Sequence, residues 1–246
     1  MEQEIKKQVW TSDILILMGA WLWGKKEYGH ALLCFHGSSL GMKVGAQLGI
    51  TWEDYIDGYK QMRYVLTYDD GKVSKRQLGI YFQDITLEAF KELKIKDRKS
   101  FVYTNANTGK VLSTSTLNRE LVKFSEEFLK YVFEHTTYYL PMRELKSNAF
   151  EIAWGVDMVK KYMLTKKVFM AVSKHMGHRT MHDTYELLGL MPNDEIVLQF
   201  NLVEHGDTLK KLTSVLSDNL ALKNYIRSTG IEPIRADHLR GVQILV

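Results

Sequence analysis

The chain has 246 residues, 45% of them apolar and 11% aromatic, which is enough material for one sizeable folded core. Its 33 basic and 29 acidic residues give a net charge of only +4, so any binding of nucleic acid has to depend on where the charge lies. The single cysteine, Cys34, excludes a disulfide framework, and its apolar neighbours predict a buried thiol in an intracellular protein.

The first part of the chain has a helical pattern. Apolar stretches between residues 12 and 47 are broken at 24–26 and at 36–39, which predicts two or three packed helices. The most apolar run, 14–23, is about half the length of a membrane-spanning helix and follows the N-cap signal Thr11-Ser12-Asp13. We therefore expect a core helix there, preceded by no signal peptide, and no membrane association.

A β-hairpin is predicted next, because residues that favour strands lie on both sides of Asp69-Asp70-Gly71-Lys72. A helix is expected over 86–94 and a third short strand at 101–103. Together these segments predict a small antiparallel three-stranded sheet.

Helices are expected from 113 to about 133, from Arg143 to about Trp154, and across roughly 166–176. Beyond Pro192 the pattern changes, with a helix-like apolar stripe over 209–226. The sequence thus predicts a mostly helical α+β fold around the small sheet, with one domain at 1–192 and a C-terminal helical appendage at 193–246.

A basic segment stands out at residues 158–182, which contain six Lys or Arg and no Asp or Glu. It ends in Met176-Gly177-His178 and is followed by Tyr185. Such a segment is typical of a phosphate-handling surface with a nucleophile nearby.

Other kinds of site are poorly supported. His175, His178 and His182 are spaced three and four apart, but no HExxH arrangement accompanies them, so we expect no metal. Residues 41–45 lack the ending of a phosphate-binding loop, and 36–41 miss the Gly-x-Ser-x-Gly spacing of serine hydrolases.

Phosphoryl transfer at a DNA backbone fits better. Arg143 can donate two parallel hydrogen bonds to a phosphate, His178 follows a glycine that can aim its ring, and Tyr185 carries a hydroxyl nucleophile. The alternatives are a surface ion pair of Arg143 with Glu144 or Glu151, a capping or core histidine, and a tyrosine used for packing.

Several stretches carry a family resemblance. They are ALLCFHGSSLGMKVGAQLGITWEDYID with its L-x-W-x-D ending, the hairpin YVLTYDDGKVSKRQL, FVYTNANTGKVLSTSTLNREL, LPMRELKSNAF and KHMGHRT. In this order they resemble the catalytic domain of the tyrosine recombinases, the phage-integrase family, over roughly residues 10–190. LPMRELKSNAF is similar to the family's H-x-L-R-H-x-x-A-x box, and KHMGHRT to its LLGH box.

The resemblance implies a catalytic set with several departures. Arg143 matches the second arginine, His178 the histidine of the LLGH box, and Tyr185 the nucleophile, about two residues closer to His178 than usual. Lys43 stands in place of the first arginine and Leu140 in place of the box histidine. The general-acid lysine is Lys72 or Lys75, and about a dozen extra residues, around 159–170, separate Arg143 from His178.

The resemblance further implies double-stranded DNA as partner, no cofactor, and a cytoplasmic, nucleoid-associated protein of a mobile genetic element. The phosphate contacts expected are Arg76, Lys146, Lys160, Lys161, Lys166, Lys167, Lys174 and Arg179. The family's separate N-terminal DNA-clamping domain is not expected in this chain.

Three hypotheses stay open. One is an active recombinase that cuts and rejoins DNA through a 3′-phosphotyrosine. Another is a DNA-binding or architectural protein that keeps the fold without catalysis. The third is a protein-interaction module whose tail helix, 209–226, docks on another protomer to form a homo-oligomer.

Overall fold

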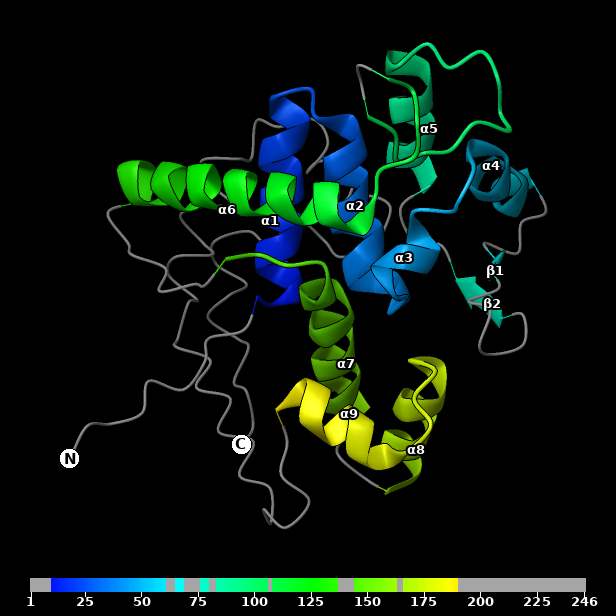
Figure 1. Ribbon diagram of the computed structural model, residues 1–246, viewed down its shortest axis with the longest axis vertical. Helices are drawn as coiled ribbons and strands as arrows, with labels where there is room; N and C mark the ends of the chain where they lie inside the picture. The colour runs from blue at the N-terminus through cyan, green and yellow to red at the C-terminus, as the bar shows by residue number, and fades with distance from the viewer. Residues whose placement is uncertain are drawn as a thin grey trace, which may run out of the picture.

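The computed structural model describes residues 10–60, 65–68, 76–79, 83–105, 108–136, 144–162 and 166–189. Within these ranges the element order is α1 (Ser12–Gly24), α2 (Tyr28–Leu40), α3 (Val44–Gln47), α4 (Trp52–Lys60), β1 (Val65–Tyr68), β2 (Arg76–Gly79), α5 (Gln83–Glu92), α6 (Thr114–Thr136), α7 (Asn148–Tyr162), α8 (Lys166–His175) and α9 (Met181–Leu188) (Figure 1). The described part is mostly helical, as the sequence predicts. The expected appendage at 193–246 lies outside it.

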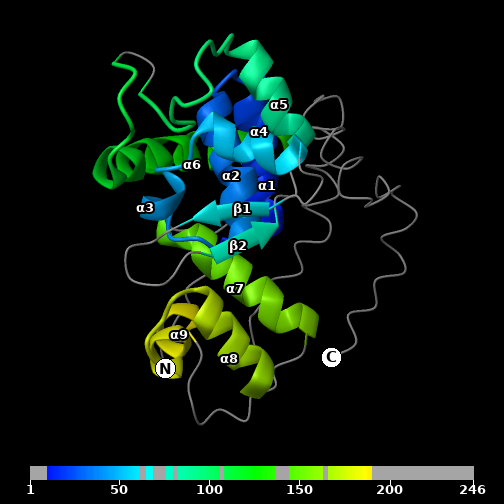
Figure 2. The same cartoon turned by 90° about the vertical axis from the view of Figure 1, so that its right-hand side faces the viewer.

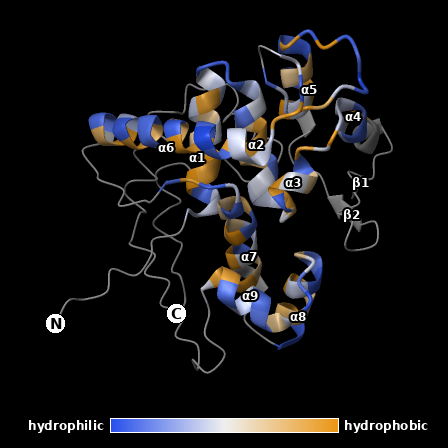
Figure 3. Ribbon diagram, viewed as in Figure 1, coloured by the Kyte–Doolittle hydropathy of each residue, from blue (hydrophilic) through white to orange (hydrophobic). Residues whose placement is uncertain are grey.

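Helix α1 is the centre of the main core. Every residue from Ile14 to Trp23 is buried, so this helix is covered on all faces, and its ribbon is mostly orange in Figure 3. Thr11 caps it by accepting a hydrogen bond from the Ile14 N–H at 3.4 Å, which confirms the predicted N-cap. Gly19 brings α2 close, because a Cβ there would lie 2.9 Å from the Phe35 ring.

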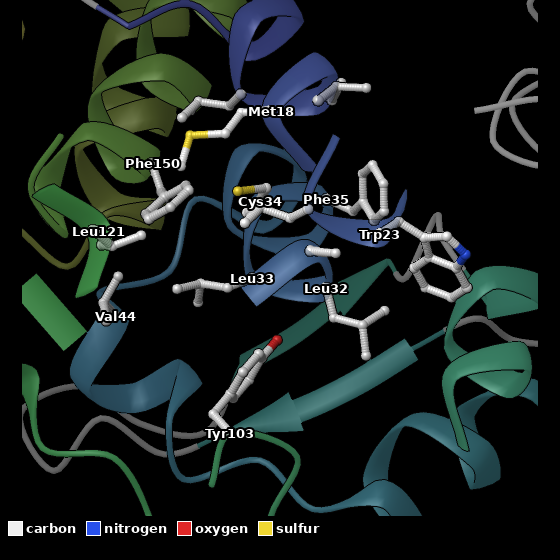
Figure 4. Close-up of a cluster of buried hydrophobic side chains, with 14 of the residues drawn as sticks. Met18, Trp23, Leu32, Leu33, Cys34, Phe35, Val44, Tyr103, Leu121 and Phe150 are labelled. Atoms are coloured by element: carbon white, nitrogen blue, oxygen red, sulfur yellow. The ribbon is translucent and has the colours of Figure 1, made fainter. Parts of the chain in front are cut away.

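The predicted break at 36–39 is wrong, since α2 runs through it to Leu40. The Ser38 and Ser39 hydroxyls donate back to the carbonyls of Cys34 and Phe35, both at 2.8 Å, and so stay within the helix. Gly37 lies within the helix and allows α7 to pack closely, because a Cβ there would meet the Phe150 ring of α7 at 2.8 Å. Figure 4 shows Cys34, Phe35 and Phe150 in this core, and Cys34 is buried as predicted.

Helix α4 is not among the predicted elements. Thr51 and Asp54 form reciprocal hydrogen bonds across its first turn: Thr51 N donates to Asp54 Oδ2 at 2.8 Å, and Asp54 N donates to Thr51 Oγ1 at 3.2 Å. This is a capping-box arrangement, and the Thr-x-x-Asp signal for it is visible in the sequence.

The predicted hairpin is confirmed in its two strands, which pair antiparallel with Val65 opposite Gly79 and Tyr68 opposite Arg76. The predicted third strand of this sheet is wrong. In the described residues the sheet has two strands, and residues 101–103 lie elsewhere, forming an isolated bridge from Phe101 to Thr51. Val102 N donates to Ile50 O at 3.0 Å, so the backbone groups of this segment are bonded to the loop before α4.

The helix predicted from Arg143 begins later, at Asn148. The backbone just before it is bonded to α6: Leu145 N donates to Ser125 Oγ at 3.4 Å, and Ser147 N to Asn118 Oδ1 at 2.9 Å. Because these tertiary bonds satisfy the N–H groups and Leu145 is fully buried, the segment stays outside the helix. Helix α6 itself crosses α1 and α2 in Figure 1.

The last three helices form a second hydrophobic cluster, which we call the α7–α9 cluster. Its buried members are Trp154, Val156, Val159, Phe169, Val172, Met176 and Leu188. Gly155 lets α9 approach α7, because a Cβ there would lie 2.7 Å from Leu188 Cδ2. Figures 1 and 2 show α8 and α9 packed at the lower end of α7, while the beginning of α7 reaches the main core.

Candidate functional site

The structure describes part of the predicted catalytic set. Lys43, His178 and Tyr185 lie in described segments, whereas Arg143, Lys72, Lys75 and Leu140 fall outside the described residues. The site is therefore built from the α7–α9 cluster and the loop that carries Lys43.

His178 lies in the turn that follows the C-terminus of α8. Gly177 adopts the left-handed conformation, with φ +74. The Gly177 N–H donates to Lys174 O at 3.2 Å, and the His178 N–H donates to Ser173 O at 3.1 Å. These two bonds are those of a Schellman motif, in which glycine is preferred because it has no Cβ to strain. The Met-Gly-His tripeptide of the sequence thus ends the helix and turns His178 toward α7 and α9.

The His178 ring contacts two other helices. Its Nδ1 lies 2.8 Å from Thr184 Oγ1 of α9, and its Nε2 lies 3.7 Å from Glu151 Oε1 of α7. The His178 side chain is 10% exposed, the Glu151 side chain 8%, and Thr184 is fully buried. An imidazole, a hydroxyl and a carboxylate therefore meet near the surface of the α7–α9 cluster.

Helix α9 begins at a second capping box, at residues 180–183. The Thr180 side chain accepts from Asp183 N at 3.2 Å, and Asp183 Oδ2 accepts from Thr180 N at 3.0 Å. The hydrogen bond from the Thr180 N–H lowers the pKa of the Asp183 carboxyl below its ordinary value, so this exposed cap stays ionised. The cap fixes the first turn of α9, which ends with Thr184 and is followed by Tyr185.

Tyr185 is half-buried and lies flat on Phe169 of α8, with ring centroids 4.1 Å apart and planes 22° apart. It belongs to the rim of the α7–α9 cluster. By the predicted resemblance, Tyr185 lies about two residues closer to His178 than the usual family nucleophile. Two residues along an α-helix turn a side chain by about 200°, so Tyr185 is on a different face of α9 from that position.

Lys43 is exposed and precedes α3. The chain just before it is anchored to the α7–α9 cluster, because Gly41 packs against Trp154 and the Leu40 carbonyl lies 2.9 Å from His175 Nε2. The His175 ring stacks on Trp154 at 4.2 Å. Lys43 thus follows a loop that contacts α7 at Trp154, three residues along the chain from Glu151.

Most of the predicted DNA contacts belong to α7, α8 or the segments beside these helices. Those with exposed side chains are Lys146, Lys166, Lys167, Lys174 and Arg179. Lys160 and Lys161 belong to the last turns of α7, and Arg76 is the first residue of β2.

Two residues of this site are missed by sequence reasoning. The sequence suggests Glu151 only as a surface partner of Arg143, but Glu151 is 6% exposed and faces His178. Thr184 carries no motif that marks it as functional. Its position four residues after the cap residue Thr180 is the only local hint that it faces the preceding turn.

Two kinds of feature are not found in the described part of the chain. No group of three His, Cys, Asp or Glu side chains there is placed to hold a metal ion. No described helix is long and apolar enough to cross a membrane.

This mostly helical body with a small hairpin has the fold of the tyrosine recombinases. The structure of XerA recombinase matches 87% of this chain with a TM-score of 0.55 and 9% identity, and 65% of that chain is covered. The Tn1549 transposon integrase, in complex with a circular intermediate DNA, matches 76% with a TM-score of 0.52 and 14% identity, and 63% of that chain is covered.

The chain thus spans about 65% of the length of the first and 63% of the second. No family model matches the sequence, and a comparison with curated proteins finds no match. The likeness therefore establishes the fold, and the fold confirms the predicted resemblance.

Proposed function

We propose that this protein binds double-stranded DNA and acts as a recombinase or integrase of the tyrosine type. The observation that carries the proposal is the set of exposed basic side chains on α8 and its flanking turns, next to His178, on a tyrosine-recombinase fold. Lys166, Lys167 and Lys174 are exposed on one helix, while Phe169 and Val172 of the same helix are buried. A helix fixed by its apolar face in this way presents its cations to a phosphate backbone.

The proposed reaction is a phosphoryl transfer without metal or cofactor. The Tyr185 hydroxyl loses its proton to solvent, its oxygen attacks the scissile phosphorus, the bond to the 5′-oxygen breaks, and a 3′-phosphotyrosyl link forms. Lys72 or Lys75 gives its proton to the leaving 5′-oxygen, while Arg143 and Lys43 hold the non-bridging oxygens. His178 donates a hydrogen bond to the same phosphate. Rejoining reverses these steps with a new 5′-hydroxyl.

Two substitutions weaken this reaction. Lys43 supplies a charge but not the paired donors of a guanidinium. Leu140 supplies no hydrogen bond where the family has histidine. Because the loss of one preorganised donor costs on the order of 10²–10³ in rate, slow cleavage is expected.

A second function, DNA binding without cleavage, is favoured by the placement of Tyr185. Its ring is stacked on Phe169 and is half-buried, and its position on α9 differs from that of the family nucleophile. In this second function the basic residues keep their role and the protein organises DNA.

A covalent-adduct assay separates the two functions. The protein is incubated with nicked duplexes from its own genetic neighbourhood, and a denaturation-resistant protein–DNA adduct is scored beside a salt-titrated gel shift. An active recombinase gives an adduct that the Tyr185→Phe variant abolishes while its gel shift persists. Tyr131→Phe, a half-buried tyrosine of α6, is the matched control and keeps the adduct.

The other outcomes are equally distinct. A salt-sensitive gel shift without an adduct supports DNA binding alone. An adduct that survives Tyr185→Phe removes Tyr185 from the mechanism. The absence of both signals contradicts the proposed function while leaving the fold unaffected. Association of protomers through 193–246 remains a separate proposal, since that segment lies outside the described residues.

A further inference from the structure

A second basic segment lies at the end of α5 and in the turn after it, at residues 91–99, which we call the α5 basic turn. It holds two acidic residues, Glu92 and Asp97, and five exposed basic ones: Lys91, Lys94, Lys96, Arg98 and Lys99. Figures 1 and 2 show α5 and this turn at the upper end of the molecule and α8 at the lower end. The α5 basic turn is therefore separate from the candidate site.

The two acidic side chains of the turn are bonded within the protein. Asp97 Oδ1 accepts a hydrogen bond from the Lys99 N–H at 2.9 Å, and the Glu92 carboxylate accepts one from the Tyr28 hydroxyl of α2. In the described part of the chain, none of the five basic side chains forms an ion pair. Their donors are therefore available to an anion from outside.

The backbone of the turn is fixed to the start of α4. The Glu53 N–H donates to Arg98 O at 2.7 Å, and the Trp52 N–H donates to Ser100 O at 3.1 Å. A partner that binds here does not have to order the chain first, which lowers the cost of binding.

Phe101 follows the turn directly and is 41% exposed. Its backbone is held on both sides, because Ser100 is bonded to α4 and the Val102 N–H donates to Ile50 O at 3.0 Å. The ring belongs to neither hydrophobic cluster, and among the described residues it stacks on no other aromatic ring. An aromatic face thus lies within three residues of Arg98 and Lys99.

The chemistry of this surface selects among polyanionic partners. Four of the five cations are lysines, which are depleted at protein–protein interfaces. A lipid surface is met by the apolar face of an amphipathic helix, and a turn has no such face. A DNA duplex offers phosphates but covers the faces of its bases. A single strand offers phosphates to the cations and an unpaired base to the ring.

We propose that the α5 basic turn and Phe101 form a binding site for single-stranded DNA, in which the cations bind phosphates and the ring stacks on a base. Binding of this kind tolerates any sequence, because every base has a π-face. The inference goes beyond the proposed function, since none of these residues is among the catalytic residues or DNA contacts that the sequence implies.

The first test isolates the stacking. Fluorescence anisotropy measures binding of the full chain to a labelled thymidine oligonucleotide of about 16 nucleotides and to an abasic strand of equal length, which keeps the phosphates without the bases. We expect the wild type to prefer the thymidine strand. Phe101→Ala should weaken thymidine binding by at least about 5-fold and leave abasic binding unchanged. Phe133→Ala, at an exposed phenylalanine of α6, is the matched control and keeps both affinities.

The second test concerns the cations. The triple variant Lys96→Gln, Arg98→Gln and Lys99→Gln should reduce the slope of log K against log salt by about 0.7 for each phosphate that is no longer neutralised. The control replaces Lys123 and Lys130 of α6 by Gln and keeps the slope. An unchanged slope in the triple variant overturns the site.

The ratio of thymidine to abasic affinity also separates this surface from α8. The Lys166→Gln, Lys167→Gln variant should keep the ratio. A ratio that is lost there but survives in Phe101→Ala places the strand on α8 and overturns the inference, as does equal affinity of the wild type for both strands. Tighter binding of a uridine strand would assign the site to RNA instead.

A further pair of variants keeps the test decisive if Phe101→Ala does not fold, as judged by thermal unfolding. Phe101→Tyr keeps the aromatic ring and should keep the thymidine preference, whereas Phe101→Leu keeps an apolar side chain without a ring and should lose it. Equal preference in both variants contradicts stacking. If the protein fails to bind duplex DNA, the proposed function has failed, and the two strands still decide whether this site exists.

Discussion

At the scale of single residues, the main core contains a buried polar network. His36 is fully buried, with Nε2 2.7 Å from Thr86 Oγ1 and its ring stacked 4.4 Å from that of Tyr55. The Tyr55 hydroxyl lies 2.9 Å from that of Tyr103, which accepts from Gln47 Nε2 at 3.1 Å. The network ties α2, α4, α5 and the loop after α5 together, and Tyr103 projects into the core in Figure 4. Hydrogen bonds offset the cost of burying these groups.

His36 makes the stability of the fold depend on pH. Burial lowers the pKa of His36 from its ordinary 6.5 to about 3, because the charged form loses its hydration. Between these values the unfolded chain takes up a proton that the folded chain does not, so the free energy of unfolding falls as pH falls. The slope is at most about 1.4 kcal/mol per pH unit.

Replacing His36 is therefore expected to flatten the acid side of the stability profile. From pH 7 to pH 5 the His36→Gln variant should lose about 2 kcal/mol less than the wild type, as measured by urea unfolding at each pH. His182→Gln, at an exposed histidine of α9 (side chain 66% exposed), is the control and keeps the wild-type slope. An identical slope in His36→Gln and wild type contradicts the assignment.

At the scale of elements, α8 combines a packing face and a charged face. Phe169, Val172 and Ser173 are buried, whereas Lys166, Lys167 and Lys174 are exposed, and the first turn contains no acidic residue. Two lysines at a helix N-terminus oppose the helix dipole, which favours anions there. Their placement is unfavourable for the isolated helix and is consistent with a phosphate-bearing partner.

Neutralising these lysines tests that interpretation. The double variant Lys166→Gln and Lys167→Gln should bind duplex DNA more weakly, with the slope of log K against log salt reduced by about 0.9 for each phosphate that the protein no longer neutralises. Thermal stability should not fall, since the lysines oppose the dipole. The matched control replaces Lys123 and Lys130, exposed on α6, and leaves the slope unchanged. Equal salt slopes for both double variants would remove α8 from the DNA interface.

At the scale of the whole molecule, the candidate site depends on how the α7–α9 cluster is joined to the main core. The joint lies at Gly41, which has φ +60 and whose missing Cβ leaves room for the Trp154 ring; an added Cβ would come within 2.3 Å of it. His175 completes the joint through the Leu40 carbonyl. The position of the loop that leads to Lys43 follows from these contacts with α7 and α8.

The Gly41→Ala variant should consequently lose both stability and DNA binding. Left-handed strain costs about 1 kcal/mol, and overpacking against Trp154 adds about 1–3 kcal/mol. Gly109→Ala is the matched control, since Gly109 has φ +64 but nothing within 4 Å of an added Cβ, so it carries the strain alone. Urea unfolding of both variants measures the difference, and equal losses would show that crowding at Trp154 contributes nothing.

Local sequence was sufficient to predict the core helix α1, the hairpin strands, helices α5, α6 and α8, and the basic segment around α8. These features depend on hydrophobic periodicity, turn residues and charge within a short stretch of chain. The order of the motifs was also sufficient to predict a mostly helical, recombinase-like fold, which the structural likeness confirms, although the predicted sheet of three strands has two in the described residues. The two Thr-x-x-Asp boxes that begin α4 and α9 are also local signals, although hydrophobic periodicity does not reveal them.

The other features of the fold and site could not be predicted from local sequence, because they depend on tertiary contacts between groups far apart in the chain. Helix α2 continues through 36–39, where Gly37 packs closely against the Phe150 ring of α7. Helix α7 begins later than predicted because Ser125 and Asn118 accept hydrogen bonds from the backbone before it. The partners of His178 come from α7 and α9. No periodicity identifies them, since a side chain finds its hydrogen-bond partner only after the helices that carry the two have packed.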